Sequence, residues 1–433
     1  MDSFYQIYKK EMKRIKTFYW LRNKRIGVVI LCFFMFFNYA QSKNKSTGRF
    51  ISINGQNLIA PDGSSFLMKG INLGNWLNPE GYMFLFQDVN SYRLIDQALK
   101  EMVGPDFANR FWKEFQDNYI TKEDIHYIRQ TGMNSIRIPF HYKLFTNEDY
   151  MGCNNPNRGF ELLDRLIRWC KEEGLYVVLD MHDAPGGQTG DNIDDSYSYP
   201  WLFESKESQQ RFCDIWSRIA KHYANEPTVI GYDLLNEPIA HYFENKDELN
   251  KQLEPLYTQV AASIRKVDKN HILILGGAQW NTNFSVFENS TFDPKIMYEC
   301  HTYWSDTTKT SIQKFLDFRE KMNLPIYMGE TGENTDEWIG GFRRLLEQNN
   351  IGWHFWPYKK MVKSSCMVSI KAPMNWNEIV AFTGKDRSSF AKIREARPDQ
   401  QKIKKVLNDY LENIQMSRCI KNTGYTKALG MNP

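Results

Sequence analysis

The sequence predicts an α/β fold, a single (β/α)₈ barrel, from three observations. Eight short apolar segments recur along the chain, at residues 66–71, 134–140, 175–182, 229–237, 271–277, 295–301, 325–330 and 351–356. They are continuous apolar runs, which is typical of parallel strands buried on both faces. Helical patterns separate most of them, and no glycine-rich dinucleotide-binding loop follows the first segment. Eight such units favour a closed barrel over an open doubly wound sheet.

Amphipathic segments with helix start and stop signals lie between the predicted strands. Thr121 opens a capping-box pattern with the acidic residue three positions later, and the helix from 121 runs to 130. Residues 159–174 carry apolar side chains at spacings of three and four and end on Gly174. The other predicted helices are 209–223, 246–267, 310–322, 335–348 and 400–414.

Three further segments fall outside the repeating units. A short hairpin with Pro61-Asp62-Gly63 as its turn leads into the first strand. Residues 75–120 and 357–398 are longer than ordinary connections between a strand and a helix. We interpret both stretches as long loops, after the first and eighth strands, that wall a cleft without forming a second domain.

The first forty residues predict a secretory signal peptide. Eight basic residues precede the apolar run 26–37, and Met12 is an alternative initiator. This run is shorter than the roughly 20 residues that span a bilayer, although an uncleaved anchor stays open. We therefore expect a catalytic domain at 41–433 in a secreted, periplasmic or cell-surface protein, with no stable membrane partner beyond such an anchor.

Charge and cysteine usage exclude several classes of function. The whole chain is +4, and the first forty residues contribute eight basic and two acidic groups, or +6, which leaves about −2 for the rest. That balance has no basic excess for binding nucleic acid. The six cysteines after residue 40 lack the spacings of a zinc site. We predict no cofactor and no metal.

The tripeptide Asn-Glu-Pro occurs on both sides of the fourth predicted strand, with Glu226 before the strand and Glu237 after it. Active sites of (β/α)₈ barrels lie at the carboxyl ends of the strands, whereas the opposite end serves stability. Glu226 is therefore expected in an exposed turn, and Glu237 at the catalytic mouth.

Other polar residues stand at the ends of neighbouring strands. They are Arg137, His182, Asn236, His301, Tyr303, Glu330 and Trp356. Two carboxylates that face each other across a sugar are what glycoside hydrolysis requires, one protonated and one ionised. A neighbouring cation and donated hydrogen bonds lower a carboxyl pKa, so Arg137 and Tyr303 would make Glu330 the nucleophile. Glu237 is then the acid/base.

The ordered motifs of the chain resemble those of glycoside hydrolase family 5. They are "GINLGNW", "RIPF", "LDMHDAPGGQTG", "LLNEP", "HTYW", "MGETG" and "GWHFWPYK". This cellulase family comprises retaining β-glycosidases with a (β/α)₈ barrel, and the loop motifs are closest to its exo-β-1,3-glucanase-like branch. The resemblance implies an oligo- or polysaccharide substrate.

The resemblance also implies roles for individual residues. Glu237 would be the acid/base and Glu330 the nucleophile of a double displacement. The implied substrate-binding residues are Asn236 at the 2-hydroxyl, Arg137 and Tyr303 orienting Glu330, His182 and His301 lining the cleaved-sugar subsite, and Trp356 as that sugar's stacking platform. Trp280 is a further stacking candidate, as are Trp76 and Trp304.

Two departures from the pattern leave the substrate open. Asp183 stands where the exo-glucanase-like branch has glycine, and the acidic loop with Glu333 and Asp336 has no assigned role. A β-linked glucan or glucoside is expected, with β-mannan or a glycolipid as alternatives. A non-catalytic carbohydrate-binding barrel is a third alternative, and a metal-dependent hydrolase built on Asp180, His182 and Asp183 is a fourth.

Overall fold

The computed structural model of the protein describes residues 48–289 and 292–433, of which 49–433 form one compact unit. The predicted signal peptide lies outside the described residues. No helix in the described part of the chain is both long enough and apolar enough to cross a membrane. The six cysteines after residue 40 are all unpaired, and four of them are buried.

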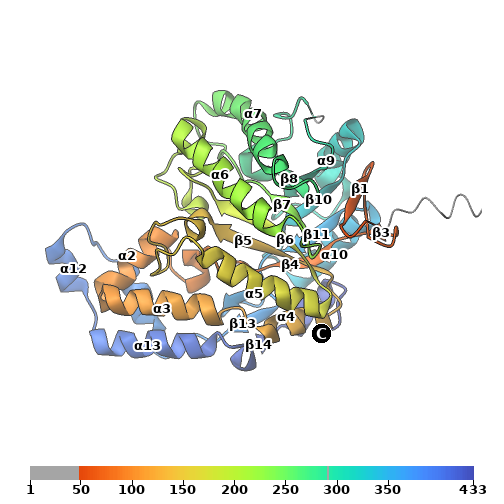
Figure 1. Ribbon diagram of the computed structural model, residues 1–433. Coiled ribbons are helices and arrows are strands. Elements are labelled where there is room, and N and C mark those ends of the chain that lie inside the picture. Colours follow the sequence, from red (N-terminus) through yellow and green to blue (C-terminus); the bar gives the residue numbers. More distant parts are fainter. Residues whose placement is uncertain (1–47, 290–291) are drawn as a thin grey trace, which may run out of the picture. The chain divides into compact units, whose positions relative to one another are not determined.

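Eight parallel strands close into a barrel in the order β10-β11-β4-β5-β6-β7-β8-β9 (Figure 1). They are β4 (Lys69–Asn72), β5 (Ser135–His141), β6 (Tyr176–Asp183), β7 (Val229–Asp233), β8 (Ile272–Gly276), β9 (Ile296–His301), β10 (Ile326–Glu330) and β11 (Gly352–Phe355). Nearly every strand residue is buried, as continuous apolar runs predict. The predicted fold class is confirmed.

Helices surround the barrel close to the predicted bounds. They are α4 (Lys122–Gln130), α5 (Arg158–Glu173), α6 (Lys206–Tyr223), α7 (Lys246–Arg265), α9 (Lys309–Met322), α10 (Asp336–Gln348) and α13 (Gln400–Asn413). Thr121 and Asp124 form the predicted capping box at the start of α4. Gly174 ends α5 with φ 70°, a left-handed conformation that glycine adopts without a steric penalty.

The amino-terminal segment corrects one predicted strand. Residues 66–71 are not one strand, because β3 (Ser65–Phe66) pairs with β2 (Asn57–Ile59), and β4 begins only at Lys69. With β1 (Ser52–Asn54) these form a small antiparallel sheet. Ile51 and Leu58 join a buried cluster with residues inside the barrel, among them Tyr327. The sheet therefore covers the amino end of the barrel, opposite the mouth.

The two long insertions after the first and eighth strands contain regular structure that the sequence prediction did not specify. The first holds η1 (Gly81–Phe84), α2 (Tyr92–Val103) and α3 (Pro105–Asn118); the second holds β12 (Lys359–Met361), β13 (Val368–Ile370), α11 (Trp376–Thr383) and α12 (Phe390–Ala396). They pack on each other, since the ring of Trp376 stacks on Phe86 at 6.2 Å and its indole donates to the Phe84 carbonyl at 2.9 Å. Figure 1 shows α2, α3, α12 and α13 together at one side of the barrel.

The remaining elements are short and belong to loops or to the end of the chain. They are η2 (Tyr142–Phe145), η3 (Asn192–Asp194), η4 (Trp201–Phe203), α8 (Ala278–Asn281), η5 (Met416–Arg418), β14 (Ile420–Lys421) and α14 (Thr423–Ala428). β12, β13 and β14 form a second small sheet.

Candidate active site

The structure brings the predicted site residues together at the carboxyl ends of the barrel strands. Arg137 lies on β5, His182 on β6, His301 on β9 and Glu330 on β10. The loops that follow β7, β9 and β11 supply the others, which are Asn236, Glu237, Tyr303 and Trp356. Glu226 stands before β7 at the opposite end, where it pairs with the exposed Lys171 at 3.0 Å. The two Asn-Glu-Pro tripeptides thus lie at opposite ends of the barrel, as expected, but Glu226 is half-buried and not exposed.

Glu237 and Glu330 face each other across the mouth. A carboxylate oxygen of each lies within 4.8 Å of the other, with a nitrogen of His301 in the same group. The Nδ1 atom of His301 is 2.7 Å from Oε1 of Glu237 and 3.8 Å from Oε2 of Glu330. This carboxylate separation suits a pair that acts on the two sides of one glycosidic bond.

The backbone at Glu237 is strained and is held by the loop after β6. Glu237 has φ 46°, a conformation that costs a residue other than glycine about 1–3 kcal/mol. The Gln188 side chain donates to the Asn236 carbonyl at 2.8 Å, and the Thr189 hydroxyl donates to the Glu237 carbonyl at 2.8 Å. The loop motif "APGGQTG" therefore holds the backbone of Glu237 in this conformation in the loop after β7.

Arg137 is the charge centre beneath the two glutamates. Its guanidinium is fully buried and contacts four carboxylates, those of Asp180 (3.1 Å), Asp233 (2.7 Å), Glu299 (3.1 Å) and Glu330 (2.6 Å). Burial, followed by the charge of Glu299, raises the pKa of Asp233 well above its ordinary value. A raised pKa favours the neutral form of Asp233, which would reduce the negative charge around Arg137.

The surroundings of Glu330 keep it ionised. Burial alone would raise its pKa, but the nearby His301 and Arg137 cations outweigh that effect and lower the pKa below its ordinary value. The Tyr303 hydroxyl donates to its Oε2 at 3.0 Å. An ionised carboxylate with two fixed donors is what a nucleophile at this position requires.

His301 carries a positive charge of its own. Burial would lower its pKa, but Glu330, Glu237 and Glu299 around it raise the pKa to about 10. Its Nε2 atom is 2.8 Å from Glu299, so each ring nitrogen faces a carboxylate. His301 therefore links the two candidate catalytic glutamates and Glu299 through one imidazolium.

We expect this raised pKa to make stability fall in alkali. The stabilisation is fully present below pH 6.5, the ordinary histidine pKa, and is lost as pH rises towards 10. Between pH 7.5 and 10 the unfolding free energy of the wild type should therefore fall by on the order of 2–3 kcal/mol more than that of His301→Gln. His354→Gln is the control, because burial holds the pKa of His354 at about 3 and its charge does not change in this range. Urea unfolding at both pH values measures the difference, and equal losses in wild type and His301→Gln would contradict it.

His182 contacts both Asn236 and Trp356 beside Glu330. The Nδ1 atom of His182 is 2.8 Å from Asp180, and Asn236 accepts from Arg137 at 2.9 Å. The Trp356 ring is nearly parallel to the His182 ring at 5.7 Å. A Cβ atom on Gly74 would lie 2.7 Å from the Trp356 ring, so the glycine of "NLGNW" permits this close packing. The indole of Trp356 donates to the Tyr82 hydroxyl at 2.7 Å.

The three other predicted tryptophans have different surroundings. Trp280 is partly exposed beside His241 at 4.7 Å, and Trp304 is 73% exposed next to Tyr303. Trp76 is fully buried, and its indole donates to the Gln116 carbonyl on α3 at 2.8 Å. The prediction that Trp76 could stack on substrate is wrong, because this ring belongs to the core beneath the first insertion.

Sequence reasoning missed several residues of the mouth. Asp233 and Glu299 each interrupt an apolar strand with a carboxylate, which is a detectable signal because an unpaired buried charge is costly. Glu80 gave no such signal. Its side chain is buried near His182 and Glu330, and burial raises the pKa of Glu80 to about 8. Its Oε1 atom has no hydrogen-bond partner among the described residues.

The acidic motif behind the metal alternative does not form one ligand set. Asp180, His182 and Glu330 approach one another closely enough to hold an ion, but Asp180 and Glu330 are already paired with Arg137. Asp183 belongs to neither of the described ligand groups, and its Oδ1 lies 4.0 Å from His141 Nε2. The three residues of the motif therefore have different neighbours and do not share one coordination site.

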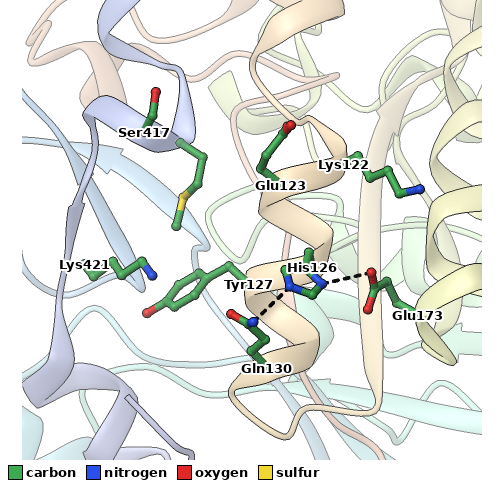
Figure 2. A pocket seen from close by; sticks show the side chains of 9 residues that line it. Lys122, Glu123, His126, Tyr127, Gln130, Glu173, Ser417 and Lys421 are labelled. Carbon is green, nitrogen blue, oxygen red and sulfur yellow. Dashed lines mark hydrogen bonds and ion pairs between the residues drawn. The ribbon is translucent and has the colours of Figure 1, made fainter.

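A pocket of about 460 Å³ lies elsewhere, on the outside of the barrel. Figure 2 shows it between α4 and the carboxyl-terminal segment with Ser417 and Lys421. The His126 ring is held between Glu173 at 3.0 Å and Gln130 at 2.9 Å. None of the residues of the barrel mouth lines this pocket.

A barrel with paired carboxylates and a buried arginine at its mouth defines a glycoside-hydrolase type of protein. The model of cellulase (glycosyl hydrolase family 5) matches residues 96–361, which is more than half of the chain. The chain belongs to this family.

Curated relatives and a solved structure agree with the assignment. A β-xylosidase of Phanerodontia chrysosporium is 33% identical over 239 residues, which cover 55% of this chain and 48% of the relative. The chain thus spans about half the length of that relative. Endoglucanase C of Acetivibrio thermocellus is 28% identical over 58% of this chain and 87% of its own. The crystal structure of an endogalactoceramidase matches with a TM-score of 0.57 at 16% identity, over 88% of this chain and 84% of that one, which supports the fold.

Proposed function

We propose that the protein is a retaining β-glycosidase that hydrolyses a β-linked glucan or glucoside by double displacement. The observation that carries this proposal is the pair of carboxylates, Glu237 and Glu330, whose nearest oxygens are within 4.8 Å at the barrel mouth. Separations of about 5 to 5.5 Å are typical of retaining enzymes, whereas inverting enzymes need roughly 6.5 to 9.5 Å to admit a water. The pair therefore supports retention.

The two glutamates take different roles in this proposal. Glu330, ionised beside Arg137 and His301, attacks the anomeric carbon and forms a covalent glycosyl ester. Glu237 protonates the leaving oxygen and then removes a proton from the water that cleaves the ester. Asn236, between Arg137 and His182, is placed to bind the 2-hydroxyl of the sugar beside them.

The names of the relatives support a glucan or glucoside as substrate. Endoglucanase C is named for action on a glucan, and the β-xylosidase is named for action on a β-xyloside. Trp356, whose ring lies parallel to that of His182 at 5.7 Å beside Glu330, is the ring that we propose packs against the apolar CH face of such a pyranose.

A panel of aryl β-glycosides and β-1,3-, β-1,4- and β-1,6-glucans tests the proposal, with products followed by proton NMR. We expect cleavage of β-glucosides or one glucan class, with the β-anomer appearing first in the product. A first-formed α-anomer would contradict retention. Absence of cleavage across a panel extended to β-mannan and glycolipids would contradict the activity.

A further inference from the structure

An ion pair stands at the end of β10, in the acidic loop that the family motifs leave unassigned. Glu333 follows Glu330 by three residues, has φ 51°, and pairs with the ammonium of Lys360. Lys360 is only 5% exposed, and its Nζ atom lies 5.3 Å from the centre of the Tyr82 ring. A lysine that is this deeply buried needs a partner to stay charged, and Glu333 provides it.

The pair lies beside the candidate nucleophile. Burial chiefly raises the pKa of Glu80, Tyr82 and Tyr303, and the nearby negative charge of Glu333 adds to each rise. Tyr303 is the residue that donates to Glu330. Tyr82 in turn accepts a hydrogen bond from Trp356. The ion pair therefore belongs to the wall that Trp356 and Tyr82 form.

The order of strands places this wall opposite the acid/base. Glu333 follows β10, Lys360 follows β11 and Tyr82 follows β4, and these three strands are neighbours in the barrel. Glu237 follows β7, which is four strands away from β11 in either direction around the ring. Because Glu237 protonates the leaving oxygen, the leaving group lies on the β7 side. The far end of the cleaved sugar then faces Glu333 and Lys360.

The polar groups of this wall have hydrogen-bonding capacity to spare. Among the described residues the Lys360 ammonium has one hydrogen-bond partner, Glu333, although it carries three N–H donors. Oε1 of Glu333 accepts from the Lys360 ammonium, and the Oε1 atom of Glu80 has no hydrogen-bond partner among those residues. Hydroxyl groups both donate and accept, so a sugar edge can satisfy donors and acceptors together. The opposite charges of Lys360 and Glu333 cancel, and the acidic Glu80 offers no cation for an anionic group. The wall therefore favours an uncharged sugar over an anionic one.

We propose that Glu333 and Lys360 bind the hydroxyl groups of a neutral sugar at the edge remote from the cleaved bond, and that they close the subsite behind it. The enzyme then acts on the non-reducing end of its substrate. This inference rests on the proposed glycosidase function and names its specificity. Asp336 takes no part, because it begins α10.

Deoxy-sugar substrates test the pair directly. The probes are the aryl β-glycoside that the wild type cleaves, its 3-, 4- and 6-deoxy analogues, and the corresponding uronic acid. We expect the wild type to discriminate against at least one deoxy analogue by about 10- to 100-fold in kcat/KM, as hydrogen bonds to charged groups do. Glu333→Gln and Lys360→Met should each reduce that ratio towards one. The uronic acid should be cleaved at least tenfold more slowly than the parent.

A matched surface pair controls for charge changes. Lys402 and Glu378 form an exposed ion pair between α13 and α11, away from the mouth. Lys402→Met and Glu378→Gln are expected to keep the wild-type ratios.

An oligosaccharide with a borohydride-reduced end should lose single sugars from its other end only.

Several outcomes would overturn the inference. Equal kcat/KM values of the wild type for the parent and every deoxy analogue would overturn it. This test uses the wild type only, so it still holds if a variant fails to fold. An equal loss on all substrates in both variants would make the pair structural only, and internal cleavage of the reduced oligosaccharide would contradict a closed subsite. Failure of the proposed function is distinct, since the wild type would then cleave no parent glycoside.

Discussion

Glu330→Gln should lower kcat by about 10⁴-fold or more, the loss expected when a covalent nucleophile is removed. The amide has nearly the same shape as the carboxylate and can still meet the Tyr303 hydroxyl, which is 3.0 Å from Oε2. It cannot form a glycosyl ester, and it removes one of the negative charges around Arg137. Steady-state kinetics on an aryl β-glycoside measure the effect.

The chain supplies a matched control for this substitution. Glu226→Gln changes the same residue type within the same tripeptide as Glu237, at the opposite end of the barrel. We expect it to keep wild-type kcat and KM. Circular dichroism of both variants separates a loss of fold from a loss of chemistry. A folded Glu330→Gln protein with more than a tenth of the wild-type rate would remove Glu330 as nucleophile.

Glu237→Gln should have an effect that depends on the leaving group. General acid catalysis contributes about 10²- to 10⁴-fold, but only where the leaving oxygen needs a proton. We therefore expect losses of that size in kcat/KM for an alkyl β-glycoside and a small loss for a 2,4-dinitrophenyl β-glycoside, whose phenolate leaves unaided. The His301 side chain, 2.7 Å from Glu237, is unchanged in the variant and keeps the mouth assembled.

The comparison between the two leaving groups is the control for binding. A glutamine that merely disturbed the site would slow both glycosides by the same factor. Equal losses would thus argue that Glu237 positions the substrate and that another group donates the proton. Accumulation of a covalent intermediate with the dinitrophenyl glycoside is also expected, because Glu237 is needed again to activate water.

The parts of the fold that follow from local pattern could be predicted. Continuous apolar runs identified the barrel strands because both faces of a parallel sheet are buried, and strand ends then located Arg137, His182 and Glu330. The apolar run at 66–71 did not reveal that the strand pairs with β2 at Phe66 and with the barrel only from Lys69. Pairing partners are set by tertiary structure.

The parts that depend on distant contacts could not be predicted. Glu80 lies in a loop with no strand pattern, and its carboxyl meets His182 and Glu330 only because the first insertion folds over the mouth. The motif "NLGN" before Trp76 does not distinguish a buried tryptophan from one that stacks on substrate. Its burial depends on α3, a helix within the first insertion that the sequence pattern did not reveal.

Trapping the covalent intermediate tests the central claim most directly. A 2-deoxy-2-fluoro β-glucoside with a dinitrophenyl leaving group slows both steps, and slows hydrolysis of the ester enough for the intermediate to accumulate. We predict that mass spectrometry of the intact protein finds one added fluorosugar, and that peptide mapping places it on Glu330. A label on Glu237 would contradict the account. Turnover of this substrate with no label on any carboxylate near Arg137 would also contradict it.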